Sequence, residues 1–208
     1  GADVRVVPNA YNDDIFHPRP DVPRERDVLF VGRLVSDKGG SLLVTALGKL
    51  AESGLRPTFT ITGSGPEEKP LKEQVVALGL EKQAVFTGPL RGEALARTMN
   101  AHRVQVVPSI WEEPFGIVAL EGIASGCRVI GSRKGGLGDA IGACGLLFEN
   151  GNAEELAAAL KTAITGGEPV ASLAAQLEHL ARHQKNSVVE AYEKVLMQAQ
   201  KRSSKSSS

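Results

Sequence analysis

The chain has 208 residues, of which 42% are hydrophobic, 23% charged and 4% aromatic, and its 24 basic residues are balanced by 24 acidic ones. This length suits one domain of ordinary size, and the composition is typical of a globular protein with a packed core. A net charge of +0 and few aromatic side chains argue against a nucleic-acid-binding surface. No apolar run approaches the ~20 residues that are needed to cross a bilayer.

Short apolar, β-branched runs alternate with longer helical patterns. The runs are nearly continuous in apolar residues, as is typical of strands buried on both faces. They predict strands at Val4–Val7, Val28–Gly32, Thr58–Thr62, Ala84–Thr87, Val104–Val107, Val129–Gly131 and Gly145–Phe148. Helical spacing predicts helices at Gly40–Glu52, Glu67–Leu78, Glu93–Ala101, Ile117–Ser125, 153–164 (capped by Asn152), about Ser172–Arg182 and Ser187–Gln200.

This alternation predicts a single doubly wound, Rossmann-like α/β domain with a mostly parallel sheet over residues 1–200. Residues 201–208 contain only Lys, Arg and Ser, and we expect them to form a disordered tail. Ligands of such sheets bind outside the carboxyl ends of the strands, so function is sought in the loops that follow strands.

The two cysteines, Cys127 and Cys144, form no CxxC pair and have no histidines nearby at metal-ligand spacing. They are interpreted as small buried side chains in a reducing compartment. No signal-peptide pattern is present, and we expect the protein to be cytoplasmic.

Two cations follow the predicted strand Val28–Gly32. The planar guanidinium of Arg33 can bind two oxygens of a diphosphate, while Lys38 provides a mobile point charge. Taken alone, this loop is explained equally well as a solvated loop with surface charges.

A second loop, 63–68, begins like the dinucleotide fingerprint GxGxxG, but Glu68 stands where the third glycine is required. It also lacks the Gly-Lys-Ser/Thr ending of a P-loop. A tight turn before a helix can still donate backbone N–H groups to a ligand.

The segment 108–122 carries two carboxylates around the start of a predicted helix. The helix N-terminus offers an anion site made of the N–H groups of Gly116, Ile117 and Val118. Glu113 precedes this helix, and Glu121 lies one turn into it on the same face as Ile117. Two carboxylates beside one anion site suit hydroxyl groups on either side of phosphates, those of a ribose and of a sugar.

Either glutamate taken singly can also be an exposed acid near a helix terminus. Glu121 fits that interpretation poorly, because its neighbours in the sequence are apolar and a buried, unpaired carboxylate is costly. We therefore expect it to have a partner. The loop 132–139 adds backbone donors and two cations, Arg133 and Lys134, or is simply a flexible crossover.

In this order, these landmarks resemble the retaining GT-B glycosyltransferases of the glycosyl transferase group 1 family (family 4), from about Val4 to Leu196. The motifs are Val7-Pro8-Asn9-Ala10 with Phe16-His17-Pro18, Gly32-Arg33-Leu34 with Lys38-Gly39, Gly63-Ser64-Gly65-Pro66, Phe86-Thr87-Gly88, Pro108-Ser109 with Glu113 and Glu121, Gly126–Ile130, Gly135-Gly136 and Gly145–Phe148. Ala10, Gly122 and Cys127 depart from the family's usual residues, and none of these changes removes a ligand-binding side chain.

The resemblance implies the C-terminal, donor-binding half of a GT-B fold, acting on a nucleoside-diphosphate sugar such as a UDP- or GDP-sugar without metal or cofactor. Arg33 and Lys38 would bind the diphosphate, and these two residues with Glu113 would be catalytic. Glu113 would bind hydroxyls of the transferred sugar, and Glu121 those of the ribose. Further donor contacts are implied for Gly63, Leu90, Phe115, Gly116, Ile117 and Leu120.

The family's N-terminal, acceptor-binding domain is missing from this sequence, so we expect a chain that binds donor but is catalytically incomplete. Any peripheral membrane contact would be made by that domain. One alternative is a non-catalytic nucleotide-binding module that serves a partner subunit. A glycoside hydrolase using Glu113 and Glu121 would leave Arg33 and Lys38 unexplained, and Glu68 disfavours an NAD-dependent dehydrogenase.

Overall fold

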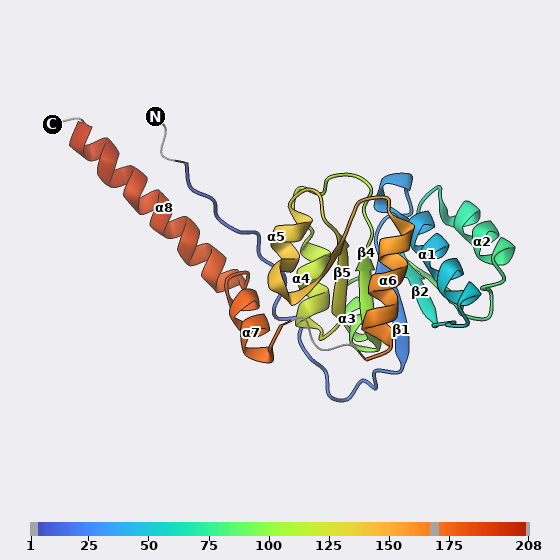
Figure 1. Ribbon diagram of the computed structural model, residues 1–208. Coiled ribbons are helices and arrows are strands. Elements are labelled where there is room, and N and C mark those ends of the chain that lie inside the picture. The colour runs from blue at the N-terminus through green and yellow to red at the C-terminus, as the bar shows by residue number, and fades with distance from the viewer. Residues whose placement is uncertain (1–3, 167–170, 207–208) are drawn as a thin grey trace.

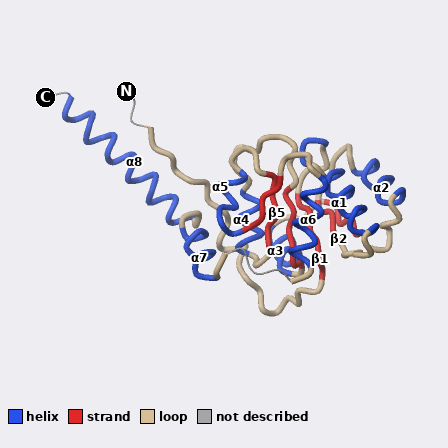
Figure 2. The backbone as a smooth tube through the Cα atoms, viewed as in Figure 1, coloured by secondary structure: helices blue, strands red, loops and turns tan. Residues whose placement is uncertain are grey.

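The computed structural model describes residues 4–166 and 171–206, which fold around one six-stranded sheet (Figures 1 and 2). The strands are β1 (Arg26–Val31), β2 (Phe59–Thr62), β3 (Ala84–Gly88), β4 (His102–Val107), β5 (Arg128–Ser132) and β6 (Gly145–Phe148). They lie in the order β3-β2-β1-β4-β5-β6, and every neighbouring pair is parallel. The prediction of a doubly wound α/β domain is confirmed.

Helices cover both faces of this sheet. Their bounds are α1 (Gly40–Glu52), α2 (Glu68–Ala77), α3 (Gly92–Asn100), α4 (Ile117–Ala124), α5 (Leu137–Ile141), α6 (Ala153–Ile164), α7 (Leu173–Ala181) and α8 (Lys185–Ser206), with short 3-10 helices η1 (Ser36–Lys38) and η2 (Gly142–Cys144). Asn152 caps α6 as predicted, because its side chain accepts a hydrogen bond from the Glu155 N–H at 3.1 Å.

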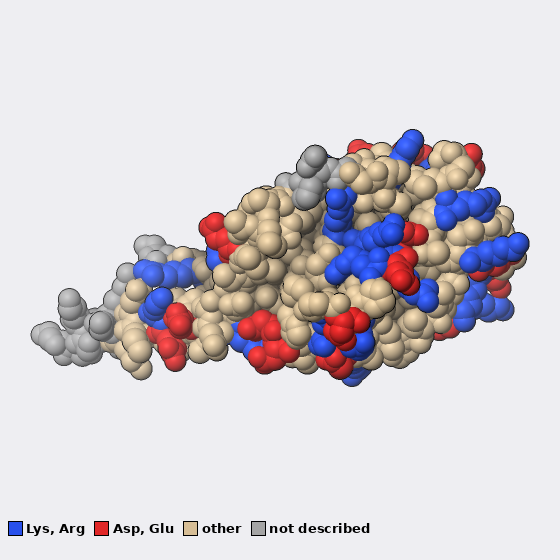
Figure 3. All heavy atoms as spheres, turned by 90° about the horizontal axis from the view of Figure 1, so that it is seen from below, with Lys and Arg blue, Asp and Glu red and all other residues tan. Residues whose placement is uncertain are grey.

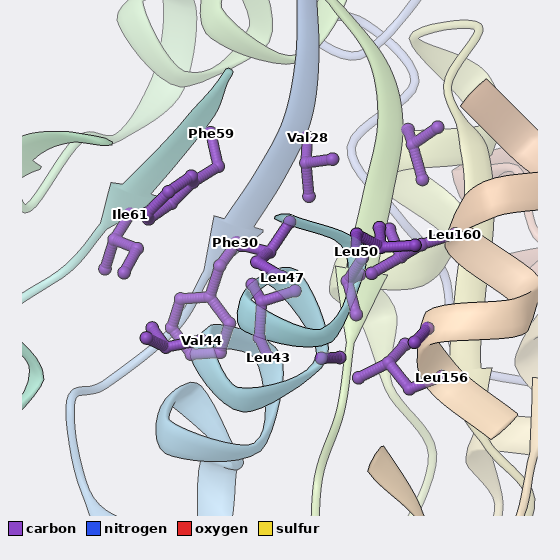
Figure 4. Packing of buried hydrophobic residues seen from close by; sticks show 14 of the residues in the cluster. Val28, Phe30, Leu43, Val44, Leu47, Leu50, Phe59, Ile61, Leu156 and Leu160 are labelled. Carbon is purple, nitrogen blue, oxygen red and sulfur yellow. The ribbon is translucent and has the colours of Figure 1, made fainter. Parts of the chain in front are cut away.

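Alternate residues of each central strand point to opposite faces, and each face has its own apolar cluster. Val28 and Phe30 of β1 pack against α1, α2 and α6, whereas Leu29 packs among side chains of α3, α4 and α5. Figure 4 shows the first cluster, with side chains of β1, β2, α1 and α6 pointing toward one another. Since both faces are buried, the strands read in the sequence as continuous apolar runs.

The ends of the chain differ from expectation. The predicted strand Val4–Val7 is wrong: this segment pairs with no strand of the described sheet, and Val4 and Val6 are 82% and 93% exposed. A β-branched run favours an extended backbone but needs a neighbouring strand to form a ladder. At the other end α8 continues to Ser206, beyond the predicted end at Gln200, while 207–208 lie outside the described residues. Both ends project away from the sheet (Figure 1).

The surface at the amino ends of the strands mixes both signs of charge. Figure 3 shows Lys and Arg side chains gathered at the centre of this face, with Asp and Glu directly beside them. Arg103 and Asp27, for example, form an ion pair of 3.4 Å. Because the cations are interspersed with acids, this face offers no uniform basic track of the kind that binds a phosphate backbone.

A buried amide separates β4 from α4. Gln105 is fully buried, its Nε2 donates to the Val118 carbonyl at 2.9 Å, and its Oε1 has no hydrogen-bond partner. A Cβ at Gly122 would lie 2.0 Å from that Oε1. The glycine at 122 therefore makes the room that the Gln105 side chain occupies.

Gly122→Ala should lower the free energy of unfolding by about 1–3 kcal/mol, because the new methyl group overpacks a rigid contact. Gly48→Ala in α1 is the matched control. Its Cβ would meet Leu78 Cδ1 at 3.0 Å, and that side chain is exposed and can move. We expect Gly48→Ala to change stability by no more than ~1 kcal/mol. Adding Gln105→Val to Gly122→Ala should recover most of the loss in urea denaturation; equal stability of Gly122→Ala and the parent would refute the steric account.

Candidate functional site

The candidate site lies between β1 and β4, where the order in which successive strands are added to the sheet changes direction. β1 and β4 are neighbours, paired at Val28 with Val104 and Phe30 with Val106. From β1 the chain proceeds to β2 and β3 on one side, and from β4 to β5 and β6 on the other. The loops after β1 and β4 thus flank the switch point, which is the usual ligand crevice of an open α/β sheet.

The backbones of these two loops touch. Gly39 has φ +71°, in the left-handed region, and a Cβ there would lie 1.9 Å from the Pro108 carbonyl oxygen. The Asp37 carbonyl accepts hydrogen bonds from the N–H groups of Ile110 and Trp111, at 2.8 and 3.3 Å. This contact requires glycine at 39, and it brings the β1 loop against the β4 loop.

Lys38 and Glu113, predicted to act on one ligand, are held together. Lys38 Nζ forms an ion pair with Glu113 Oε1, and the buried Ser109 hydroxyl donates to the same oxygen at 2.6 Å. The side chains of Lys38 and Glu113 are only 25% and 14% exposed. The sequence did not predict this direct pairing, because it placed the two groups on different parts of the donor.

Arg33 differs from Lys38 in being exposed and unpaired. Its guanidinium has no hydrogen bond or ion pair with any residue that the structure describes. The planar fork, which could bind two oxygens at once, is therefore free at the end of β1.

The start of α4 forms one wall of a cavity of about 280 Å³. Gly116 has φ +104° at the N-cap, where a Cβ would lie 2.6 Å from Leu137 Cδ1, and no side chain caps the helix. The N–H groups of Ile117 and Val118 are thus left for a ligand, whereas Ala119 N–H donates to the Gly116 carbonyl at 2.9 Å. The cavity lining comprises Phe30, Val31, Gly32, Lys38, Val107, Pro108, Ser109, Glu113, Gly116, Ile117 and Val118.

Arg33, Glu121 and the other predicted contact residues lie outside this lining. Leu120 is fully buried and packs in the core between the sheet and α4, while Leu90 is partly buried against the same cluster. Phe115 packs its ring 5.5 Å from that of His183, away from the cavity. A Cβ at Gly63 would lie 1.8 Å from the Gly32 carbonyl oxygen, so Gly63 is needed for the packing of its loop on the β1 loop.

Glu121 is half-buried in α4 and has no hydrogen-bond or ion-pair partner within the described part of the chain. Burial raises the pKa of its carboxyl group to about 7. The partner expected from the sequence is therefore not supplied by the described residues, and the carboxyl group is available to a ligand.

The loop after β5 supports Glu113 through its backbone. Gly136 N–H donates to the Glu113 carbonyl at 2.7 Å, and a Cβ at Gly135 would lie 2.5 Å from the same oxygen. The two cations of this loop are engaged elsewhere: Lys134 pairs with Glu149 at 3.7 Å, and Arg133 donates to the Leu147 carbonyl at 3.4 Å. Their predicted role as additional ligand cations is not supported by these contacts.

Sequence reasoning missed Asn150, which follows β6. Its Nδ2 donates to the Ser109 carbonyl at 3.2 Å, and its Oδ1 accepts from the Lys134 N–H at 2.9 Å. Asn150 thus links the loops after β4 and β5. The sequence did contain a signal for this role: Asn150 follows a predicted strand, and its amide can both donate and accept hydrogen bonds. We had recognised only the nearby helix cap, Asn152.

Within the described residues, no three His, Cys, Asp or Glu side chains converge in a way that could hold a metal ion. None of the described helices combines the length and the apolar character that spanning a membrane requires.

Known proteins share this architecture. Residues 12–184 match the family model described as "Glycosyl transferases group 1". The 2-deoxystreptamine glucosyltransferase of Streptomyces kanamyceticus is 32% identical over 213 residues, covering 93% of this chain and 55% of that protein. The chain spans about half the length of the curated relatives it matches.

Two solved structures show the fold. Anabaena HepE in complex with UDP and glucose has a TM-score of 0.80 at 24% identity, covering 93% of this chain and 56% of that one. The C-terminal domain of a glycosyl transferase group 1 family protein from Francisella tularensis has a TM-score of 0.67 at 22% identity, covering 88% of this chain and 98% of that one.

The buried carboxyl group of Glu121 predicts a pH-dependent stability. In the unfolded chain its pKa returns to 4.5, whereas in the folded chain it is about 7. Between these values the folded chain binds the proton more strongly, so this contribution is full below pH 4.5 and is lost as pH rises through about 7. The loss is of order 3 kcal/mol.

Glu121→Gln removes this titration. As the pH is raised from about 5 to about 8, the parent should lose free energy of unfolding that the variant keeps, so urea denaturation should show the variant gaining stability relative to the parent. Glu112→Gln, which changes an exposed acid of the preceding loop, is the control and should follow the parent at both pH values. A Glu121→Gln variant that also follows the parent would contradict the burial argument.

Proposed function

Because the chain belongs to the glycosyl transferases group 1 family, we propose that it binds a nucleoside-diphosphate sugar as the donor part of a retaining, metal-independent glycosyltransferase. The observation that carries the proposal is the convergence of Lys38, Glu113 and the uncapped start of α4 on one cavity at the sheet's switch point. This arrangement provides positive charge, N–H donors and a carboxylate acceptor within one site.

The diphosphate is assigned to the cationic side of the site. Arg33, next to the lining residue Gly32, is free to bind two phosphate oxygens, and Lys38, Ile117 and Val118 line the cavity. When the glycosidic bond breaks, negative charge develops on the departing diphosphate. Fixed cations and helix N–H groups stabilise that charge, which is the role that a metal ion would otherwise have.

The two carboxyl groups are assigned to hydroxyls. Glu113 lies in the cavity beside the proposed phosphate position and would accept hydrogen bonds from the transferred sugar. Glu121 lies deeper along α4 and would accept those of the ribose, since ligand hydroxyls would satisfy a half-buried group that lacks a protein partner. The assignment to ribose, like retention of configuration, follows the family resemblance.

Donor binding would exchange the partners of Lys38. Without ligand, Lys38 is paired with Glu113. A diphosphate carries more charge than a carboxylate and can draw the flexible Lys38 side chain to itself. Glu113 then keeps its hydrogen bond from Ser109 and gains free acceptor capacity for a sugar hydroxyl. One ligand thus engages both groups only after their mutual ion pair is broken.

The nucleotide, the acceptor and the cellular location are also proposals. HepE was solved with UDP and glucose, and a relative is named a glucosyltransferase, so UDP-glucose is the first donor to test. We propose that acceptor binding uses residues outside this chain, because the relatives are about twice as long. Cys127 and Cys144 are free and buried, which suits a reducing compartment, and we place the protein in the cytoplasm.

Arg33→Ala should weaken UDP binding by about 1.5–3 kcal/mol, the range for a hydrogen bond to a charged group. Isothermal calorimetry measures the change. Arg56→Ala is the control, because Arg56 donates to the Gly79 carbonyl at 3.0 Å, outside the cavity, and UDP affinity should stay the same. Unchanged affinity in both Arg33→Ala and Lys38→Ala would exclude the diphosphate assignment.

Glu113→Ala should separate sugar binding from nucleotide binding. The substitution frees Lys38 from its ion pair, so affinity for UDP should stay level or rise, whereas affinity for UDP-glucose should fall by about 1–3 kcal/mol because a sugar hydroxyl loses its acceptor. Calorimetric titrations with both ligands give the comparison. Equal losses for UDP and UDP-glucose would show that the assigned roles are wrong.

A further inference from the structure

The loop that carries Glu113 also exposes an aromatic ring. Trp111 is 65% exposed, and it is the single tryptophan of the chain. Its indole has no hydrogen bond, ring contact or cation–π contact with any described residue. Ile110 beside it is 50% exposed, and Ile117 at the start of α4 is 42% exposed. The segment that forms the candidate site thus presents apolar side chains to solvent.

This exposure does not come from an untethered loop. The N–H groups of Ile110 and Trp111 both donate to the Asp37 carbonyl, at 2.8 and 3.3 Å. Asn150 Nδ2 donates to the carbonyl groups of Ser109 and Ile110, at 3.2 and 3.4 Å. The backbone on which the indole is mounted is therefore anchored on two sides, to the loops after β1 and β6. Trp111 and Ile110 are not lining residues of the cavity, but with Ile117 they add exposed apolar side chains to the segment that carries Glu113.

We propose that Trp111 packs its indole against the apolar face of a six-membered polyhydroxylated ring and so helps to select the sugar chemistry of the reaction. The inference rests on the proposed function. Trp111 lies two residues before Glu113, on the same anchored segment. Glu113 provides a polar acceptor for ring hydroxyls, and the indole provides a flat apolar surface for the C–H groups of a ring face.

The chemistry of such a ring matches this pair of groups. A pyranose or cyclitol carries hydroxyls at its rim and C–H groups on its faces. It is therefore bound well by hydrogen-bond acceptors at the rim and a flat apolar side chain against one face. Aromatic side chains bury large area with little loss of conformational freedom, and the indole is the largest of them. Since acceptor binding is proposed to use residues outside this chain, we assign the ring to the transferred sugar of the donor.

Because Trp111 is the single tryptophan, acrylamide quenching of its fluorescence reports the accessibility of this one side chain. The intact 208-residue chain is titrated with UDP, with UDP-glucose, and with UDP followed by 2-deoxystreptamine, a free cyclitol. Protection of the indole by UDP-glucose assigns the ring to the donor sugar. Protection that appears only when 2-deoxystreptamine joins the UDP complex would contradict this assignment, because the ring would then belong to the acceptor.

Substitution gives the second measurement. UDP-glucose should bind about fivefold more weakly to Trp111→Ala, while affinity for UDP changes less than about twofold. Trp111→Phe should restore most of the loss. Tyr192→Ala, which removes an exposed aromatic ring from α8, should leave every affinity unchanged.

Three further results would overturn the inference. Protection by UDP alone would assign the indole to the nucleotide, its base or ribose, rather than to a six-membered ring with hydroxyls. Calorimetric binding of UDP-glucose with no protection of the indole would leave the proposed function standing and remove the role of Trp111. Failure of the chain to bind any of these nucleotides would instead refute the proposed function, and this inference with it.

Discussion

The contact between the Gly39 backbone and the Pro108 carbonyl is the constraint on which the candidate site depends. β1 and β4 are adjacent, so their following loops start side by side, but side chains would normally keep two such loops apart. With φ +71° and no Cβ, Gly39 lets the backbones meet. The Asp37 carbonyl then accepts two N–H groups from the β4 loop, and Lys38 is brought within reach of Glu113. Any larger residue at 39 would separate the cation from the carboxylate.

The loops after β5 and β6, which lie on the opposite side of β4 from β1, also hold the β4 loop in place. The Gly135-Gly136 backbone packs against the carbonyl groups of Glu113 and Pro114, and Gly136 N–H binds the first of them. Asn150 Nδ2 also donates a hydrogen bond to the Ser109 carbonyl, at the beginning of the same loop. The β4 loop is thus held by backbone contacts with the loops after β1, β5 and β6. Pre-organisation of this kind lets a site present charges and N–H groups to a ligand without ordering itself at the moment of binding.

The sequence predicted the parts of the molecule that local patterns determine. The helix Gly40–Glu52 has the bounds that its apolar spacing indicated, and the Asn152 cap forms as expected. Val4–Val7 was misassigned because strand propensity cannot show whether a neighbouring strand exists. The Lys38–Glu113 ion pair joins residues 75 positions apart. Predicting it would have required the order of strands and the loop contact at Gly39, and neither follows from a local pattern.

Charge balance would let a site with two carboxyl groups admit the diphosphate that we propose as its ligand. Two ionised, unpaired carboxylates beside the start of α4 would repel phosphate and cancel the attraction of the helix N-terminus. In the structure Glu113 is compensated by Lys38, and burial favours the protonated form of Glu121. Arg33 and the first N–H groups of α4 are then left without a compensating negative charge, and in the proposed function they would meet the phosphates. Under the proposed function, the hydroxyls of the ligand would meet the acceptors that remain, so the negative groups of the site would recognise the sugar after the positive groups had bound the phosphates.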